Sequence, residues 1–357
     1  MKRISKTLLR HADKLCRQRW RAKLRRAAEM KAGLPPSGGK LRTIIIEAPS
    51  VCDFADNYDA TVSFLIRLKR AALAEGRRER RRRVTVDMAR IEHISIDAAL
   101  VLAAEFDRWQ VMKGVKLRPL THSWAAGVRN TLCQLGLFEL LRMTPFLEAE
   151  PDVFDDVTVL KLVSCDTADG RTVAAISEHL QWVAKALGQS PYIYEAMFEA
   201  AYNSVLHAYP DTYAFKYPPI RRRWWATARW SVPENELRFL VYDQGVGIAE
   251  TLPRWKNWEH IVTFLSRIAP AASPLFKEHA TMISAALEVS RTSRSGGHGQ
   301  GLSDIVAPIE ELQAGELRIL SGKGEVMYYP DGRTVLTEHD QHIGGTLVEW
   351  KLPVSLT

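Results

Sequence analysis

The chain has 357 residues, of which 46% are hydrophobic and 25% charged, a balance that excludes wholesale disorder and suits about two globular domains. The longest uninterrupted apolar run, Ala98 to Ala104, is far shorter than the ~20 residues of a spanning helix, so we expect no membrane span and a cytoplasmic location. The four cysteines include no CxxC pair, which argues against a disulfide scaffold or a zinc site.

Positive charge is concentrated at the start of the chain. Residues 1–40 hold 13 Lys and Arg against 2 Asp and Glu, whereas the net charge of the whole chain is +8. We predict a basic helical leader over 4–31 that ends in the Gly- and Pro-rich linker 33–39. The leader favours an anionic partner, either nucleic acid or a membrane surface, although a merely solvated helix also explains it.

Residues 41–150 predict an α/β domain in which helices cover a sheet, because strand and helix patterns alternate along this stretch. The expected strands are 41–48, 84–87 and 115–120, and the expected helices are 55–75, 97–109 and 131–141.

Residues 151–357 predict an α+β domain whose antiparallel strands pack under helices. The expected strands are 157–163, 222–231, 236–243, 316–321, 324–329 and 345–352. The expected helices are 171–187, 192–208 and 302–311, and residues 257–290 should be mostly helical with breaks at Pro270 and Pro274. Arg and Trp are interleaved from Arg221 to Trp230, a pattern that can stack nucleic-acid bases but more often packs the Trp rings inward.

The predicted helix 192–208 carries three polar side chains at intervals of four residues. Glu199, Asn203 and His207 therefore share one helical face. An exposed polar stripe would show the same spacing, so this motif alone leaves a functional site and a solvated face both open.

A second motif follows the predicted strand 236–243. Asp243 ends this strand, and Gly245, Gly247 and Ile248 come directly after it. A buried carboxylate can accept a hydrogen bond from an exocyclic amine, and glycines allow a flat ligand to approach the backbone closely. The same residues could also form an ordinary turn.

Two further glycine motifs lie near the C-terminus. Gly297, Gly299 and Gly301 precede Leu302, where a helix is predicted to begin, and backbone N–H groups in such a position suit phosphate. The loop lacks the Lys-Ser/Thr pair of a Walker A motif and the βαβ context of a Rossmann fold. Gly344-Gly345-Thr346 opens the last predicted strand, where it fits either a turn or a ligand contact.

The order of these four motifs resembles the four boxes of the GHKL ATPase superfamily, which has the Bergerat (histidine-kinase-like) ATP-binding fold. The resemblance implies ATP and Mg²⁺ as cofactors, Asn203 as the Mg²⁺ ligand and Glu199 as the catalytic base. It implies that Asp243 accepts from the adenine amine, that Gly247 lets the ring pass, and that Thr346 holds adenine through water. The remaining nucleotide-binding positions are His207, Gly245, Ile248, Gly297, Gly299, Gly301 and Leu302. Residues 253–296 correspond to the mobile ATP lid, at whose end Arg291 and Arg294 could reach a γ-phosphate.

The spacing of Glu199, Asn203 and His207 looks most like that of the anti-sigma-factor serine kinases. Sensor histidine kinases fit less well, because no phosphoacceptor His motif on a helical hairpin precedes the box. Residues 41–142, with Asp97 at the start of a predicted helix, resemble the STAS domain of anti-sigma-factor antagonists. The family's phosphoacceptor Ser is replaced here by Ala98 and Ala99, and Ser95 lies two residues too early.

The resemblances together imply three segments: a basic leader over 1–40, a STAS-like regulatory domain over 41–150 and a GHKL domain over 151–357. They imply a signal-transduction protein that binds Mg-ATP and phosphorylates Ser or Thr of a partner, or switches conformation by hydrolysis. The expected partner is a STAS- or anti-sigma-type regulator, and a homodimer is possible. The alternatives are an ATPase clamp that acts on nucleic acid, which the basic leader favours, and a switch that binds ATP without hydrolysis.

Overall fold

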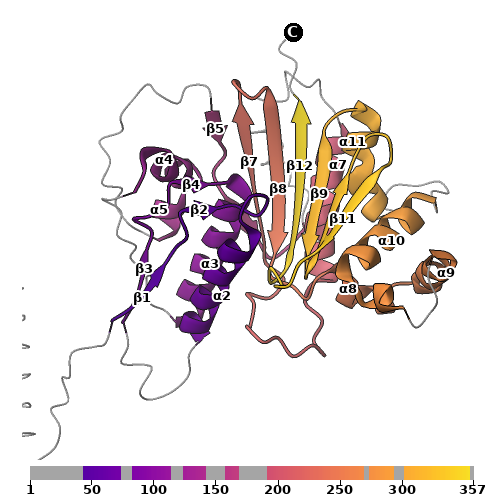
Figure 1. Cartoon of the computed structure of the whole chain (residues 1–357), viewed down its shortest axis with the longest axis horizontal. Coiled ribbons are helices and arrows are strands. Elements are labelled where there is room, and N and C mark those ends of the chain that lie inside the picture. The colour runs from indigo at the N-terminus through magenta and orange to yellow at the C-terminus, as the bar shows by residue number, and fades with distance from the viewer. Residues whose placement is uncertain are drawn as a thin grey trace, which may run out of the picture. The chain divides into compact units, whose positions relative to one another are not determined.

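The computed structural model describes residues 43–73, 83–113, 124–141, 157–168, 191–268, 273–292 and 301–353 (Figure 1). Its contacts divide the chain into two units, one of Met1–Ile44 with Glu75–Val84 and one of Ile45–Ala74 with Thr85–Thr357. Only two short stretches of the first unit are described, so the account below concerns the second. The predicted leader 1–40, strand 115–120 and helix 171–187 lie outside the described residues.

The described strands of the C-terminal half form an eight-stranded antiparallel sheet, which confirms the α+β prediction. The strand order is β11-β10-β9-β12-β8-β7-β5, and β6 also pairs with β7. The strands are β5 (Val157–Val159), β6 (Val163–Cys165), β7 (Trp224–Ser231), β8 (Glu236–Asp243), β9 (Glu316–Ser321), β10 (Gly324–Tyr328), β11 (Thr334–Glu338) and β12 (Thr346–Pro353). In the register of β8 and β12, Asp243 lies opposite Thr346, so two of the predicted motifs meet at one end of neighbouring strands.

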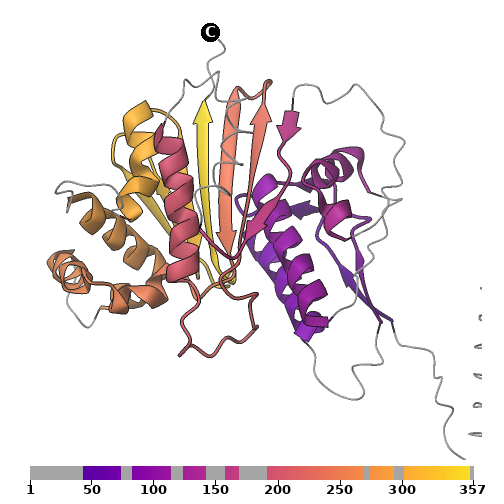
Figure 2. The same ribbon diagram turned by 180° about the vertical axis from the view of Figure 1, so that it is seen from behind.

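Three helices cover one face of this sheet: α7 (Pro191–Leu206), α10 (His279–Thr292) and α11 (Leu302–Leu312) (Figure 2). Side chains alternate along each strand, so one residue in two faces these helices. In β8 the helix-facing residues are Leu237, Phe239 and Val241, which pack in one buried cluster with Ala196 and Ala200 of α7. The helix that carries Glu199 is thereby fixed against the strand that carries Asp243.

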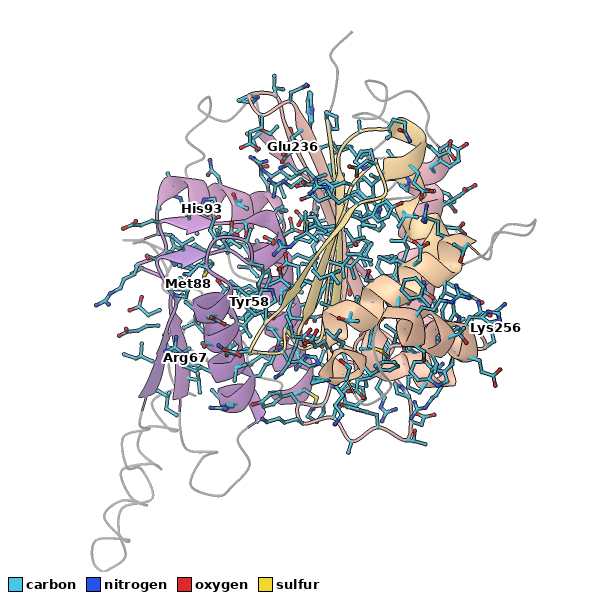
Figure 3. All side chains as sticks on the ribbon, turned by 45° about the vertical axis from the view of Figure 1, so that its right-hand side comes forward. Tyr58, Arg67, Met88, His93, Glu236 and Lys256 are labelled. Carbon is cyan, nitrogen blue, oxygen red and sulfur yellow. The ribbon has the colours of Figure 1, made fainter. Side chains whose placement is uncertain are left out.

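The opposite face of the sheet is covered by residues from the N-terminal half. The helices of the N-terminal half on this face are α2 (Tyr58–Leu73) and α3 (Ile96–Lys113), and α3 contacts strands β7 and β8. Trp225 and Tyr242 are fully buried on this face, and the Trp225 indole N–H donates to Asp107 of α3 at 3.2 Å. Tyr58 lies beside the strands in Figure 3, and its hydroxyl donates to the Gln341 carbonyl at 2.7 Å.

The rest of the described N-terminal half consists of short elements. Strand β1 (Thr43–Glu47) pairs with β3 (Arg83–Asp87), and β2 (Val51–Cys52) pairs in parallel with β4 (His93–Ile94). Two short helices follow, α4 (Ala126–Gln134) and α5 (Leu137–Leu140). Where a helix over 131–141 was expected, the chain turns at Gly136, whose φ of 84° is left-handed and ends the first helix.

Of three other expectations, two need correction and one is confirmed. The expected strand 157–163 is two short strands, β5 and β6, separated by Leu160 to Leu162, of which Leu160 still donates to the Ala228 carbonyl of β7 at 2.7 Å. The helical stretch 257–290 is broken at Pro274 as predicted, so α9 (Trp258–Ile268), the short helix η3 (Pro274–Lys277) and α10 are separate, while Pro270 lies outside the described residues. Strand β11, which was not expected, adds an edge to the sheet.

The preferred interpretation of the Arg and Trp hairpin, with its Trp rings packed inward, is confirmed for the two central rings, and the base-stacking alternative is wrong for them. Trp224 and Trp225 are both fully buried, and the Trp224 indole N–H donates to the Thr167 carbonyl at 3.0 Å. Neither ring is therefore available to a nucleic-acid base. Among the described helices, none combines the length and the apolar character that a membrane crossing requires.

Candidate functional site

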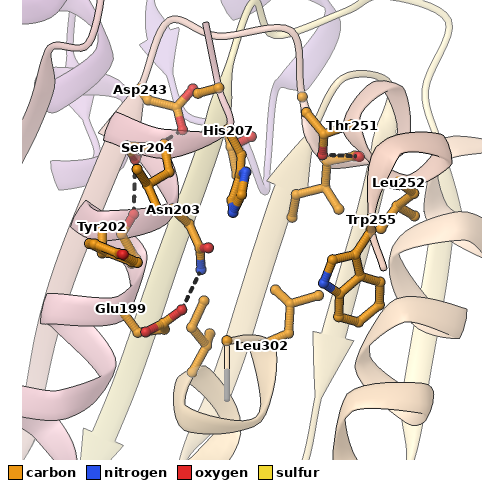
Figure 4. Close-up of a pocket in the computed structure, with 18 of the residues that line it drawn as sticks. Glu199, Tyr202, Asn203, Ser204, His207, Asp243, Thr251, Leu252, Trp255 and Leu302 are labelled. Carbon is orange, nitrogen blue, oxygen red and sulfur yellow. Dashed lines mark hydrogen bonds between the residues drawn. The ribbon is translucent and has the colours of Figure 1, made fainter. Parts of the chain in front are cut away.

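A pocket of about 730 Å³ brings most of the predicted site residues together (Figure 4). Its wall is formed by α7, the ends of β8 and β12, the first turn of α11, and the segment from α8 (Ile248–Thr251) through η2 (Leu252–Arg254). The predicted residues that line it are Glu199, Asn203, His207, Asp243, Gly247, Ile248, Gly301, Leu302 and Thr346. Gly245 does not line the pocket, and Gly297, Gly299 and Arg294 lie outside the described residues.

Helix α7 presents its polar stripe to this pocket. The Asn203 amide nitrogen donates to Glu199 Oε1 at 3.1 Å, so its amide oxygen is the atom left for a ligand or a cation. Burial raises the pKa of the Glu199 carboxyl, and the nearby Asp304 raises it further, while the bond from Asn203 opposes both. His207 also lines the pocket, and partial loss of water lowers its pKa.

Asp243 is a buried carboxylate at the end of β8. It accepts from the Gly245 N–H at 2.7 Å and from the Ser204 hydroxyl at 3.1 Å. Burial is the main cause that raises its pKa to about 6, and these hydrogen bonds oppose the rise. The Thr346 backbone N–H also bonds this carboxylate, so three of the four acceptor positions on its two oxygens are used and one is left for a donor from the pocket.

Thr346 is tied to the segment after Asp243 through a serine that the sequence did not reveal. The hydroxyls of Thr346 and Ser321 are 2.8 Å apart, and the Ile248 N–H donates to the Ser321 hydroxyl at 2.8 Å. This chain of hydrogen bonds fixes the strand ends of β9 and β12 to the first turn of α8. Ser321 ends an apolar strand without any motif around it, which is why sequence reasoning missed it.

Two of the predicted glycines are explained by the backbone at the pocket. Gly247 has a φ of 93°, and a Cβ there would lie 3.2 Å from Ser321 Oγ. Gly301 has a φ of 74°, and a Cβ there would lie 3.7 Å from Glu199 Oε1, so the glycine loop ends beside that carboxylate. Both positions favour glycine because L side chains rarely adopt such a φ.

A glycine is needed at position 245 for a different reason from the expected close approach of a ligand. A Cβ there would lie 2.4 Å from the Ala208 Cβ and 2.5 Å from its carbonyl oxygen. The glycine therefore allows the loop to pack on the end of α7, and its own N–H restrains Asp243. Its contribution to the site is indirect.

The opposite wall includes the start of the segment 253–296 that was compared with an ATP lid, although the motif analysis singled out none of its lining residues. Thr251, Leu252, Arg254, Trp255, Lys256 and Asn257 line the pocket from the segment that follows Ile248. Arg254 also donates to the Thr212 hydroxyl at 3.1 Å. A run of cationic and aromatic residues directly after the Asp243 motif was the available signal. Arg291, which was considered as a residue that could reach a γ-phosphate, forms hydrogen bonds at 2.9–3.2 Å with Glu288 of its own helix and does not line the pocket.

The described residues contain no group of three or more His, Cys, Asp or Glu side chains arranged for a metal ion. A cation in this pocket would therefore take few protein ligands, and the Asn203 amide oxygen is a suitable one for a hard cation. The pocket as a whole offers a buried acceptor near Asp243, cations at Arg254 and Lys256, and a carboxylate base at Glu199.

Comparison with known proteins adds no relative: no protein-family model matches the chain, and no curated protein matches its sequence.

Proposed function

We propose that this pocket binds Mg-ATP in a site of the GHKL type, and that the chain phosphorylates Ser or Thr of a partner protein or switches conformation on hydrolysis. One observation carries the proposal: Asp243, the Glu199–Asn203 pair, Gly301 and Thr346 come from four separate motifs and line a single pocket. Motifs that were turns or solvated stripes would have no reason to converge in this way.

The end of the pocket at Asp243 fits an adenine ring. The carboxylate can accept from an exocyclic amine, and burial makes that interaction strong because water does not compete with it. Gly247 lines the pocket next to it, and its φ of 93° allows the backbone to turn there close to a flat ring.

The end at Asn203 fits phosphates and Mg²⁺. Mg²⁺ usually keeps waters and takes one or two protein oxygens together with substrate phosphates, so a single amide oxygen at Asn203 is sufficient. Gly301 directly precedes α11, whose first N–H groups suit an anion, and Arg254 and Lys256 add positive charge to the wall. When bound, Mg-ATP supplies the phosphoryl group and a cation that spreads its charge.

Glu199 is suited to act as a general base. The hydrogen bond from Asn203 holds its carboxylate in place, and the raised pKa makes it a better proton acceptor than an exposed glutamate. Glu199 would accept the proton of the attacking hydroxyl group, which belongs to a Ser or Thr of the partner or to water.

The N-terminal STAS-like segment is proposed as a docking or regulatory module and not as a phosphoacceptor. Asp97 is buried and paired with Arg318 of β9 at 3.0 Å, and its Oδ1 accepts from the Ala98 N–H at 2.8 Å. Ala98 and Ala99 are buried as well, so this position offers neither a hydroxyl nor access.

The test follows the γ-phosphate of labelled ATP with Mg²⁺, with and without cell lysate. Glu199→Gln should reduce phosphate transfer or release by about 100-fold or more, because the proton acceptor is lost, and should retain ATP affinity. Glu195→Gln, one turn earlier on the same helix and outside the pocket lining, is the matched control and should keep full turnover.

Asn203→Ala should bind ATP equally in Mg²⁺ and in EDTA, because the metal contact is lost. Label on a partner protein would identify the kinase form of the proposal, and free phosphate alone would identify the hydrolytic switch. The proposal is wrong if the unaltered protein binds no ATP, and Glu199 is not the base if Glu199→Gln turns over normally.

A further inference from the structure

A buried charged cluster connects helices α2 and α3 to the two loops at the Asp243 end of the pocket. Lys69 of α2 is 2% exposed, and its ammonium donates to the Ile343 carbonyl at 2.8 Å. It lies 3.5 Å from Glu105 of α3, which in turn lies 3.3 Å from Arg108. Arg108 Nε donates to the side-chain oxygen of Gln244 at 3.0 Å.

The two residues that this cluster holds, Gln244 and Ile343, lie close to pocket residues along the chain. Gln244 follows Asp243, and its amide nitrogen also donates to the Ala104 carbonyl at 3.0 Å, so α3 fixes both ends of this amide. Ile343 lies three residues before Thr346. The loops that carry the acceptor and the hydroxyl are thus anchored from the side of the sheet opposite the pocket helices.

The contact at Lys69 is too close to be a loose surface interaction. Gly344 has a φ of 95°, and a Cβ at this position would lie 2.2 Å from Lys69 Nζ. The loop therefore depends on a glycine in order to wrap around the ammonium group. The cluster holds two positive charges and one negative charge, since Lys69 and Arg108 share the carboxylate of Glu105. Additional hydrogen bonds run from Lys69 to the Ile343 carbonyl and from Arg108 to the Gln244 side chain.

Such a cluster is weak evidence for stabilisation, because removing charges from water is costly and apolar side chains often replace them without loss. Its geometry gives it another role, which is to set where the two loops lie. We infer that Lys69 is a positioning residue for the purine end of the pocket, so that the N-terminal module sets base recognition through Ile343 and Gln244. This inference rests on the proposed function and concerns the same site.

The test compares Lys69→Met with the wild type by titration of the full chain with Mg-ATP and Mg-GTP. Methionine keeps the length of the side chain and leaves Glu105 paired with Arg108. If Lys69 positions the loop, ATP affinity falls about tenfold while GTP affinity, which depends on the phosphates, stays within about twofold. A merely structural loss would lower both affinities equally, so the ratio of the two separates the roles.

Arg67→Met is the matched control, because Arg67 lies in the same helix but is exposed and bonds only to the Glu47 carbonyl among the described contacts. It should leave both affinities unchanged. If Lys69→Met does not fold, Gln244→Met gives the same test from the other loop, since it removes the amide that α3 holds. An unchanged ratio of ATP to GTP affinity in the variant that folds overturns the inference. A wild-type chain that binds neither nucleotide overturns the proposed function and this inference with it.

Discussion

Replacing Asp243 by Asn should make the free protein more stable while it weakens nucleotide binding. The Asp243 carboxyl is 5% exposed, and burial raises its pKa from 3.8 to about 6. Because one pKa unit corresponds to 1.36 kcal/mol, the ionised carboxylate costs the folded protein as much as about 3 kcal/mol above pH 7. Asn has nearly the same shape and carries no charge, so the variant should recover most of that cost.

The groups around residue 243 can form hydrogen bonds with the asparagine of Asp243→Asn, so that no buried polar atom is left without a partner. Its amide oxygen can keep the bond from the Gly245 N–H, and the second lone pair of that oxygen is available to the Thr346 N–H that also bonds the carboxylate. Its amide nitrogen can donate to the Ser204 hydroxyl, which can then direct its proton to the Ala200 carbonyl at 2.9 Å instead of to residue 243. The bond that cannot be rebuilt is the one to a ligand amine, since the atom that would accept it is now a donor.

The sign of the pH dependence follows from which state binds the proton more tightly. A raised pKa means that the folded state holds the Asp243 proton more tightly than the unfolded state. The contribution of this group to stability is therefore present below pH 4 and is lost as the pH rises towards 6. The stability advantage of Asp243→Asn should be near zero at pH 4, should grow up to about pH 6, and should stay constant above it.

Urea denaturation of wild type and Asp243→Asn at pH 4.5, 6 and 8 (values chosen around the pKa of about 6) measures this advantage directly. Other buried acids, such as Glu349 with a pKa raised to about 7, affect both proteins and cancel in the difference. Asp211→Asn is the control, because that side chain is 93% exposed, and it should change stability by less than about 0.5 kcal/mol at every pH. A variant that is destabilised equally at pH 4.5 and pH 8 would refute the reasoning and make Asp243 a structural acceptor.

Two further predictions concern packing near the site. Gly245→Ala should destabilise the protein by about 1–3 kcal/mol, because the new Cβ would lie 2.4 Å from the Cβ of Ala208. Gly127→Ala is the control, since this glycine lies in helix α4 with no atom within 4 Å of the added Cβ, and it should be neutral or stabilising by up to about 1 kcal/mol. Thermal unfolding of both variants checks this difference, and equal effects on stability would contradict it. Asp97→Ala should cost about 1–3 kcal/mol in urea denaturation, because it removes one charge-assisted hydrogen bond, at 3.0 Å, from the buried Arg318. Arg318 keeps Glu325 at 2.6 Å and Glu349 at 3.6 Å, so its charge stays paired, and a loss below about 0.5 kcal/mol would show that the Asp97 contact contributes nothing.

The sequence was informative where function depends on local spacing. Glu199 and Asn203 lie four residues apart, so any helix places them on one face, and the structure joins them by a hydrogen bond. Asp243 precedes two glycines, and a strand followed by a tight loop was the simplest interpretation of that pattern. These predictions of position needed no knowledge of the rest of the chain, and every described site residue except Gly245 and Arg291 lines the pocket.

The sequence was uninformative where the decisive contact is distant along the chain. Apart from Arg238, β8 is apolar on both faces from Leu237 to Tyr242, which indicates a strand covered on both sides but not what covers it. The structure shows the covering residues, and Asp97 reaches Arg318 across a separation of 221 residues. Neither hydropathy nor a motif encodes that pairing, so Lys69 and its connection to the pocket could not be foreseen. The suggestion that Arg291 could reach the pocket did not hold, because its guanidinium pairs with Glu288 three residues earlier in the same helix.

The covered face decides which fragment of the protein can be studied. Five large side chains on it have no exposed surface: Trp225, Leu240, Tyr242, Leu320 and Leu347. Without α2 and α3 they would form a large apolar patch, and soluble domains rarely tolerate one of that kind. The residues 151–357 that carry the four motifs are therefore not expected to fold alone. Nucleotide binding must be measured on a chain that keeps the N-terminal module, and loss of binding in a shorter fragment would report misfolding and say nothing of Asp243 or Glu199.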